Sequence, residues 1–209
     1  MTSVMRKRKQ KRPLAGEIAE AIRTGAYRTG EWLRQIDLEE KFQATRFDVR
    51  AALDKLVVLK AIEHVPNRGY RVAEIDSATL RHIREARVAI ETATVASIVA
   101  AVDASTLGKL REIAERFSGA VQGGTRADWS RINSEFHHLM YHLSGNPIME
   151  ELIWNLRDRS RGSDVTVWIS HEALQRSDRD HHAMLEALEA RDSVRLTELI
   201  TGHILRNDP

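Results

Sequence analysis

The stretch "TRFDVRAALDKL", residues 45–56, combines a helix start with an amphipathic pattern. Thr45 can cap the first turn of a helix, and Arg46 and Arg50 follow one turn apart on its outer face. The apolar residues recur at helical spacing on the other face: Val49, Ala52, Leu53 and Leu56. A helix is therefore expected over about 46–59, with one face buried and arginines on the other.

Two shorter helices are expected before this one. The first is predicted by apolar residues at helical spacing: Leu14, Ile18, Ala21 and Ile22. Gly25 follows where that helix would stop, and a second helix covers about Ile36 to Phe42. The connection "QAT", residues 43–45, joins it to the helix that starts at Arg46. Two helices with so short a connection predict a helix-turn-helix.

A β-hairpin is expected directly after these helices, in "AIEHVPNRGYRVAEI", residues 61–75. Apolar residues flank a Pro-Asn-Arg-Gly turn there. Three helices followed by a hairpin are typical of a winged helix, which places a helix in the major groove of DNA. Arg46 and Arg50 could reach guanine edges or phosphates there, while Arg34 holds the backbone. The alternative is that these arginines merely solvate the helix surface.

The rest of the chain shows helical patterns alone. The expected helices cover 77–101, 103–121, 128–143, a stretch that starts at Pro147, 171–190 and 193–206. The predicted fold class is therefore mainly α. A basic disordered arm, residues 1–12, precedes an N-terminal winged helix-turn-helix over 13–74, and an all-α bundle of about six helices follows over 77–207.

Composition limits the class of protein. The 209 residues are 42% apolar and 30% charged and include no cysteine, which predicts a globular protein of a reducing cytoplasm and excludes thiolate metal sites. No apolar stretch is long enough to cross a bilayer. Residues 1–74 have a net charge of +6, and residues 75–209 one of −4. This asymmetry favours a polyanion partner, although a solvated arm explains it equally well.

A histidine-rich stretch lies in the helical part: "NSEFHHLMYHLSGN", residues 133–146. Asn133 and His137 are four residues apart and project from one face of a helix, where two side chains can share an ion. His138 and His142 form a competing pair, on a face rotated by about 100°.

Two more histidines select the first pair. His181 and His203 each lie within an apolar stripe, 11 residues before and after Asp192 in the presumed turn between the last two helices. Folding these helices into an antiparallel hairpin places both histidines at about the same height, facing inward. Together with His137 and Asn133 they would offer three imidazoles and one oxygen to Zn²⁺, Ni²⁺ or a similar divalent ion.

Three alternatives to a metal remain open for these histidines. They could donate hydrogen bonds to an acidic effector in a polar pocket, or they could be purely structural in a DNA-binding protein without effector. Three histidines and an open coordination position also describe a metal-dependent hydrolase. Against a hydrolase, the inward helical faces offer no obvious general base beside the three histidines.

The sequence resembles the GntR family of bacterial transcription regulators, in the FadR/VanR-type branch with an all-helical FCD effector domain. The matching segments are "IAEAIRTGAYRTGEWLRQIDLEEKF" (18–42), "TRFDVRAALDKL" (45–56) and "VPNRGYRV" (65–72). The resemblance implies a regulator that is not an enzyme and that binds a pseudo-palindromic DNA operator as a homodimer. It also implies that the protein represses transcription until a small organic acid binds to it. By it the DNA-binding residues are Arg34, Thr45, Arg46, Arg50, Arg68 and Gly69.

The resemblance also implies a divalent metal in the FCD domain, held by one Asp and three His, the first two in a D-x-x-x-H pattern. His137, His181 and His203 map onto the three histidines, and Asn133 stands where the Asp is expected. An asparagine oxygen can bind a metal but brings no charge. Either the affinity for metal falls, or a carboxylate effector supplies the missing charge and binds more tightly.

Four other positions matter in the light of this resemblance. Arg87 resembles an effector-pocket arginine, although a surface ion pair with Glu91 one turn later is the alternative. Gln43 and Lys60 replace residues that are usually Gly, and Asp48 replaces a usual Pro. Asp48 also brings a negative charge close to phosphates. These replacements concern the affinity for DNA more than the fold.

Overall fold

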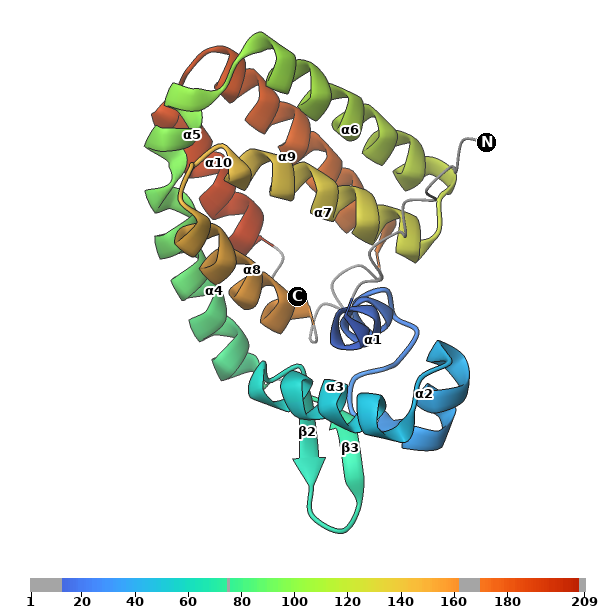
Figure 1. Cartoon of the computed structure of the whole chain (residues 1–209). Helices are drawn as coiled ribbons and strands as arrows, with labels where there is room; N and C mark the ends of the chain where they lie inside the picture. Colours follow the sequence, from blue (N-terminus) through green and yellow to red (C-terminus); the bar gives the residue numbers. More distant parts are fainter. Residues whose placement is uncertain (1–12, 75, 162–169, 207–209) are drawn as a thin grey trace, which may run out of the picture.

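The computed structural model describes residues 13–74, 76–161 and 170–206, which form a small N-terminal domain followed by a larger helical one (Figure 1). The fold class predicted from the sequence is confirmed, since the chain is mainly helical with a small sheet in the N-terminal domain. The predicted basic arm, residues 1–12, lies outside the described residues.

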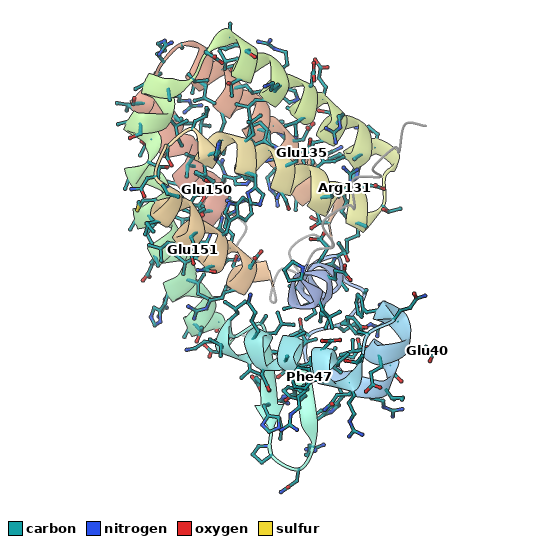
Figure 2. All side chains as sticks on the ribbon, in the orientation of Figure 1. Glu40, Phe47, Arg131, Glu135, Glu150 and Glu151 are labelled. Carbon is teal, nitrogen blue, oxygen red and sulfur yellow. The ribbon has the colours of Figure 1, made fainter. Side chains whose placement is uncertain are left out.

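Three helices build the N-terminal domain, with the bounds α1 Leu14–Arg23, α2 Gln35–Phe42 and α3 Arg46–Val58. Each helix contributes at least one fully buried apolar side chain to their common core, among them Ile18, Leu38 and Leu53. Burying a side chain of this size stabilises the fold by about 1.5–3 kcal/mol. Glu40 of α2 and Phe47 of α3 lie on the outside of the domain (Figure 2).

The predicted hairpin is present, and a third strand joins it. β2 (Ile62–Val65) and β3 (Gly69–Val72) pair antiparallel, with Val65 opposite Gly69. β1 (Trp32–Leu33) pairs with the other edge of β3, so that the order is β1-β3-β2. Two residues are too short to show an alternating pattern, so the sequence does not predict β1. Its pairing ties the wing to the segment before α2.

The described part of the C-terminal domain is made of helices, with the bounds α4 Ser77–Ala93, α5 Val95–Ala101, α6 Ala104–Gly123, α7 Arg126–His142, α8 Pro147–Arg161, α9 His171–Glu189 and α10 Ser193–Leu205. The helix expected over 77–101 is divided at Thr94, which makes seven helices in these residues rather than about six. The Thr94 hydroxyl donates to the Glu91 carbonyl at 2.7 Å, a bond that competes with the helical pattern. Among the described helices, none is both long and apolar enough to cross a membrane.

The last two helices fold back on each other, as the sequence predicts, and pack side by side. In the turn between α9 and α10, Arg191 adopts a left-handed conformation with φ 53°. The Asp192 carboxylate accepts a hydrogen bond from the Arg195 amide at 2.8 Å. The Arg191 guanidinium also donates to the carbonyls of Val99 and Val102, at 2.9 and 3.1 Å. These bonds fasten the turn to the end of α5.

Candidate functional sites

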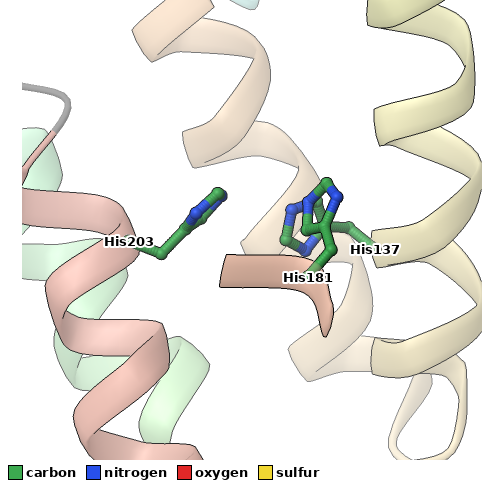
Figure 3. A group of neighbouring side chains, drawn as sticks. All are labelled: His137, His181 and His203. Carbon is green, nitrogen blue, oxygen red and sulfur yellow. The ribbon is translucent and has the colours of Figure 1, made fainter. Parts of the chain in front are cut away.

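Three histidines from three helices meet inside the C-terminal domain (Figure 3). His137 comes from α7, His181 from α9 and His203 from α10. A ring nitrogen of each lies within 4.8 Å of those of the other two. Their exposed fractions are 1%, 0% and 5%, so the cluster is buried. The packing thus brings together the three histidines that the sequence selects.

Several polar atoms of this cluster are buried without a partner. Both ring nitrogens of His137 and of His181 have no hydrogen bond to any described residue, and neither has the side-chain oxygen of Asn133. One such atom costs about 1–3 kcal/mol, and most buried polar atoms in native proteins are paired. The four ring nitrogens belong to one cluster, and the Asn133 oxygen lies about one turn before His137 on the same helix, so together these atoms indicate a site built for a ligand. Imidazole nitrogens and an amide oxygen fit a divalent metal ion.

Burial also sets the charge of the histidines. It lowers the pKa of His137 and His181 well below the usual histidine value, and the positive charge of Arg157 lowers both further. Burial lowers the pKa of His203 as well, against the opposing effect of Asp180. The rings are therefore neutral near pH 7, and neutral imidazole is the form that binds a metal.

Asp180 orients the third histidine. Its Oδ2 lies 3.0 Å from Nδ1 of His203, and its Oδ1 accepts from the Arg206 guanidinium at 2.8 Å. A proton shared with Asp180 at Nδ1 leaves Nε2 of His203 available to an ion. Asp180 directly precedes His181, but the packing of α10 on α9 is what brings it to His203, so spacing alone does not predict this role.

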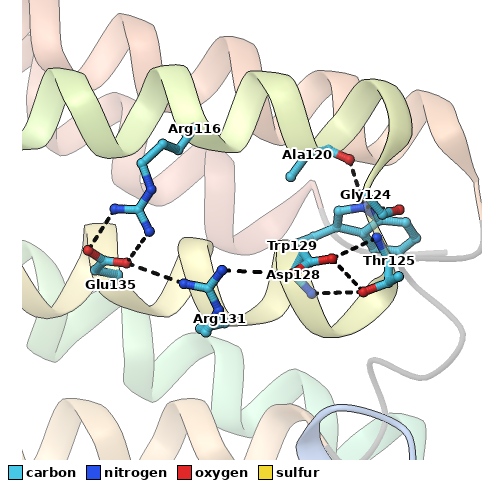
Figure 4. A network of polar contacts seen from close by, with 8 residues as sticks. All are labelled: Arg116, Ala120, Gly124, Thr125, Asp128, Trp129, Arg131 and Glu135. Carbon is cyan, nitrogen blue, oxygen red and sulfur yellow. Dashed lines mark hydrogen bonds and ion pairs between the residues drawn. The ribbon is translucent and has the colours of Figure 1, made fainter.

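α7 is placed by polar contacts along its surface (Figure 4). Thr125 and Asp128 form a capping box, so the helix begins at Arg126, before the predicted start at Asp128. Two hydrogen bonds of 2.9 Å between the Arg116 guanidinium of α6 and the Glu135 carboxylate hold the two helices together. These contacts position the buried face that includes Asn133 and His137.

A second buried polar group centres on Glu91 of α4. It accepts hydrogen bonds from Arg87 Nε at 2.7 Å, from Arg157 Nη1 at 2.9 Å and from the Tyr141 hydroxyl. Arg87 Nη1 also reaches Ser160 Oγ at 3.4 Å. Burial alone would raise the pKa of Glu91, but the two guanidinium groups lower it to about 2. Glu91 is therefore ionised and fully paired.

The Glu91 group corrects one expectation and adds two residues to the site. Arg87 does pair with Glu91, but at 8% and 0% exposure this is a buried ion pair and not a surface one. Tyr141 stacks on His137, with ring centroids 5.9 Å apart, and so connects the two polar groups. Its position one turn after His137 is visible in the sequence. Arg157 is not predictable, because α8 reaches the site only by packing on α4.

The other two histidines of α7 lie outside the cluster, as the sequence predicts. His138 stacks on Trp154, and Nδ1 of His142 lies 3.2 Å from Oε2 of Glu150. Their side chains are 52% and 76% exposed. Both line a surface cavity of about 1090 Å³ between α6, α7 and α8, whose lining does not include His137.

The residues predicted to contact DNA belong to three segments of the N-terminal domain. Arg34 precedes α2, Thr45, Arg46 and Arg50 lie at the start of α3, and Arg68 and Gly69 form the tip of the wing; all are exposed except Gly69, which is partly buried. The Arg68 guanidinium lies 4.8 Å above the Trp32 ring. Gly69 has φ 102°, a conformation that other residues rarely adopt.

The structure shows the backbone conformation or the contacts of the three residues in the DNA-binding domain that differ from the family pattern: Gln43, Asp48 and Lys60. Gln43 and Lys60 adopt φ 49° and 56° after α2 and α3, and the left-handed conformation at helix ends favours glycine. The Asp48 carboxylate accepts from the Thr45 hydroxyl at 2.7 Å, while Thr45 Oγ accepts from the Asp48 amide at 3.2 Å. Asp48 thus takes part in capping α3, where a negative charge is favourable.

Comparison with known proteins assigns both halves of the chain. The family described as "Bacterial regulatory proteins, gntR family" matches residues 10–72, and the FCD domain family matches residues 82–206. The chain belongs to the GntR family and has an FCD domain. This GntR/FCD regulator binds DNA and regulates transcription, as the winged helix indicates.

Individual relatives agree with this assignment. The transcriptional regulator McbR of Escherichia coli is 27% identical over 178 residues, 84% of this chain and 80% of McbR. The Escherichia coli repressor GlaR is 25% identical over 197 residues, 88% of each chain. The solved structure of Escherichia coli McbR/YncC has a TM-score of 0.84 at 25% identity and covers 93% of this chain and 92% of its own. Because family and relatives are regulators and not enzymes, the interpretation as a hydrolase is wrong.

Proposed function

We propose that this GntR/FCD regulator is a cytoplasmic repressor that binds a pseudo-palindromic operator as a homodimer and leaves it when a small carboxylate binds in the FCD domain. The five buried polar atoms of Asn133, His137 and His181 that have no partner among the described residues carry the proposal, because they indicate a ligand site within a regulator. The exposed arginines of α3 and of the wing support operator binding.

In this proposal four residues hold a divalent ion, zinc or nickel: Asn133, His137, His181 and His203. The ion, when bound, offers an open coordination position to an anionic oxygen. All four donors are neutral, so none of them offsets the ion's charge. Asn133 therefore favours an anionic effector over a neutral one.

The neighbouring charges support an anion as well. Arg87 and Arg157 provide two positive charges against the single negative charge of Glu91. Nε of Arg157 has no hydrogen-bond partner among the described residues and can donate to a carboxylate. We assign Arg157 to the effector site together with Arg87, which holds Glu91 in place.

Regulation then follows from linkage. An effector that binds more tightly to the arrangement of the dimer that does not fit the operator lowers the affinity for DNA by that difference in binding free energy. The proposed metal donors join α7, α9 and α10, so a ligand there changes how these three helices are held together. The relative GlaR is named a transcriptional repressor, which supports the proposal that this protein represses transcription while it is bound to DNA.

Metal analysis followed by thermal unfolding tests the effector site. We expect bound zinc or nickel, and an organic acid that raises Tm without EDTA but not with it; a ligand at 100 times its Kd adds about 2.7 kcal/mol. His181→Ala should remove both responses, whereas His142→Ala, at an exposed histidine, should keep them. If neither EDTA nor any organic acid changes Tm, the protein binds DNA without a small-molecule effector.

Asn133→Asp tests the role of the neutral oxygen donor. The added negative charge should raise the affinity for zinc and lower the affinity of the metal-loaded protein for carboxylates, both measured by calorimetry. If the native protein binds no metal and Asn133→Asp does, the native effector site works without metal, through hydrogen bonds from the histidines. Unchanged affinities would remove Asn133 from the site.

Operator binding and assembly need separate measurements. We expect the protein to select a two-fold symmetric DNA sequence, to sediment as a dimer and to lose affinity for the selected DNA in Arg50→Ala. Lys109→Ala, at a charge on α6 of the FCD domain, is the control and should bind normally. A selected sequence without symmetry, or a monomer on DNA, would contradict the proposed assembly.

A further inference from the structure

The outer face of α3 presents an aromatic side chain where the proposed function places DNA. Phe47 is 81% exposed at the second position of the helix. Leu56, in the buried core, follows nine residues later and therefore lies about 180° around the helix from Phe47. Phe47 thus points directly away from the domain core, on the helix that Figure 2 shows above the β2–β3 hairpin.

The neighbours of Phe47 on this face make a mixed apolar and basic surface. Arg50 and Ala51 lie three and four residues later, within one turn, and both are exposed. Arg46 precedes Phe47 and is exposed as well. Asp54, one turn further, accepts a hydrogen bond from the Tyr70 hydroxyl at 2.7 Å. The first two turns therefore combine a phenyl ring, a methyl group and two guanidinium groups.

The major groove offers one apolar group to such a surface. Each base pair displays a distinct set of donors and acceptors there, and thymine adds its C5-methyl group. The N-terminal residues of a recognition helix are those that reach base edges. Arginines can select guanine or hold phosphates, whereas a phenyl ring offers no hydrogen bond and gains by covering a methyl group.

We propose that Phe47 is a specificity residue that contacts a thymine methyl group in each operator half-site. This inference rests on the proposed use of α3 as the recognition helix. It assigns to Phe47 a preference for T·A at one position, beside the positions that Arg46 and Arg50 select. Removal of one buried methyl group should lower the affinity for DNA roughly four-fold per half-site, because this is the change in Kd that corresponds to the free energy of burying one CH₂ group.

Deoxyuridine substitution tests the contact, since it removes the methyl group and leaves the hydrogen-bonding edge intact. A preferred operator is first selected from random duplex DNA with the full-length protein. Each thymine of one half-site is then replaced by deoxyuridine, and Kd is measured by fluorescence anisotropy. We expect one position at which wild-type protein loses roughly four-fold. Phe47→Ala should bind thymine and deoxyuridine equally at that position.

The chain offers a matched control on the same helix. Val58 is also 81% exposed and lies 11 residues after Phe47, so it shares the outer face about 16 Å further along α3. Val58→Ala should keep both the affinity and the preference for thymine over deoxyuridine. Because both side chains are exposed, neither replacement should lower Tm, and a thermal melt of each variant checks this.

The outcomes separate this inference from the proposed function. If no thymine is sensitive to deoxyuridine, or if Phe47→Ala shows the same loss as wild type, Phe47 does not contact a methyl group. Arg50→Ala on the same operator then decides whether α3 is still the recognition helix. An operator that Arg50→Ala binds as tightly as wild type would overturn both assignments.

Discussion

The FCD domain contains two adjacent groups of buried polar residues that differ in how many of their polar atoms have hydrogen-bond partners. At Glu91 both carboxylate oxygens accept hydrogen bonds, from Arg87, Arg157 and Tyr141. At the histidine cluster, both ring nitrogens of His137 and His181 lack a partner among the described residues. The two groups touch through Tyr141, which bonds to Glu91 and stacks on His137.

The difference teaches which polar group serves the fold and which serves a ligand. The Glu91 carboxylate is saturated by its internal partners, and these bonds hold α4, α7 and α8 together; only Nε of Arg157, at the edge of this group, has no partner among the described residues. An unsaturated group costs stability until something binds it. The Glu91 group and the histidine cluster are buried to a similar extent. What distinguishes them is whether their polar atoms have hydrogen-bond partners within the protein. This comparison leads to four measurements.

Glu91→Gln should have the largest effect. It leaves two buried guanidinium groups without their counter-charge, and breaking a buried pair in this way costs about 3–5 kcal/mol in the free energy of unfolding. Glu85→Gln is the control on the same helix, because the Arg81–Glu85 pair is exposed and should contribute less than about 1 kcal/mol. Urea denaturation measures both. Equal effects would remove Glu91 from the stabilising network.

The same network predicts how stability depends on pH. The pKa of Glu91 is about 2 in the folded protein against an ordinary value of 4.5, so the stabilisation is complete above pH 4.5 and is lost as the pH falls towards 2. The stability difference between wild type and Glu91→Gln should therefore narrow over this range, by up to about 1.4 kcal/mol per pH unit. A constant difference in urea denaturation would contradict the paired, ionised state of Glu91.

His181→Leu should stabilise the protein when no metal is present. It replaces two unpaired ring nitrogens by an apolar group between Phe117 and Phe136, and the gain in EDTA should be about 1–3 kcal/mol. His182→Leu is the neighbouring control: His182 lies 3.0 Å from Ser118 Oγ and is partly exposed, so no gain is expected. A loss of stability in His181→Leu would show that its nitrogens are already satisfied.

Lys60→Gly should give the smallest effect. It tests whether a residue that lowers the stability of the folded protein can do so without belonging to a ligand site. Lys60 has φ 56°, so glycine should raise stability by about 0.5–1 kcal/mol without changing the metal response. Lys55→Gly, inside α3, is the opposite case and should cost about 1 kcal/mol. Circular dichroism melts measure both. If Lys60→Gly destabilises, the Lys60 side chain makes a contact worth more than the backbone strain.

Much of the candidate site could be predicted because its residues lie at regular spacings on helices. Asn133 and His137 share a face at any packing of α7, and His181 and His203 are symmetric about the turn at Asp192. The recognition helix is visible for the same reason. Its cap, its buried stripe and its exposed arginines follow from a period of 3.6 residues alone.

Other features depend on which helices pack together, and spacing says nothing about that. Arg157 reaches Glu91 because α8 packs on α4, and Asp180 reaches His203 because α10 packs on α9. The order of helices, the winged helix and the four candidate metal donors were thus determined by local pattern. The tertiary structure alone decided that Arg87 is buried with Glu91 and that the ring nitrogens of His137 and His181 are left without partners among the described residues, since hydrogen-bond saturation is a property of neighbours and not of sequence.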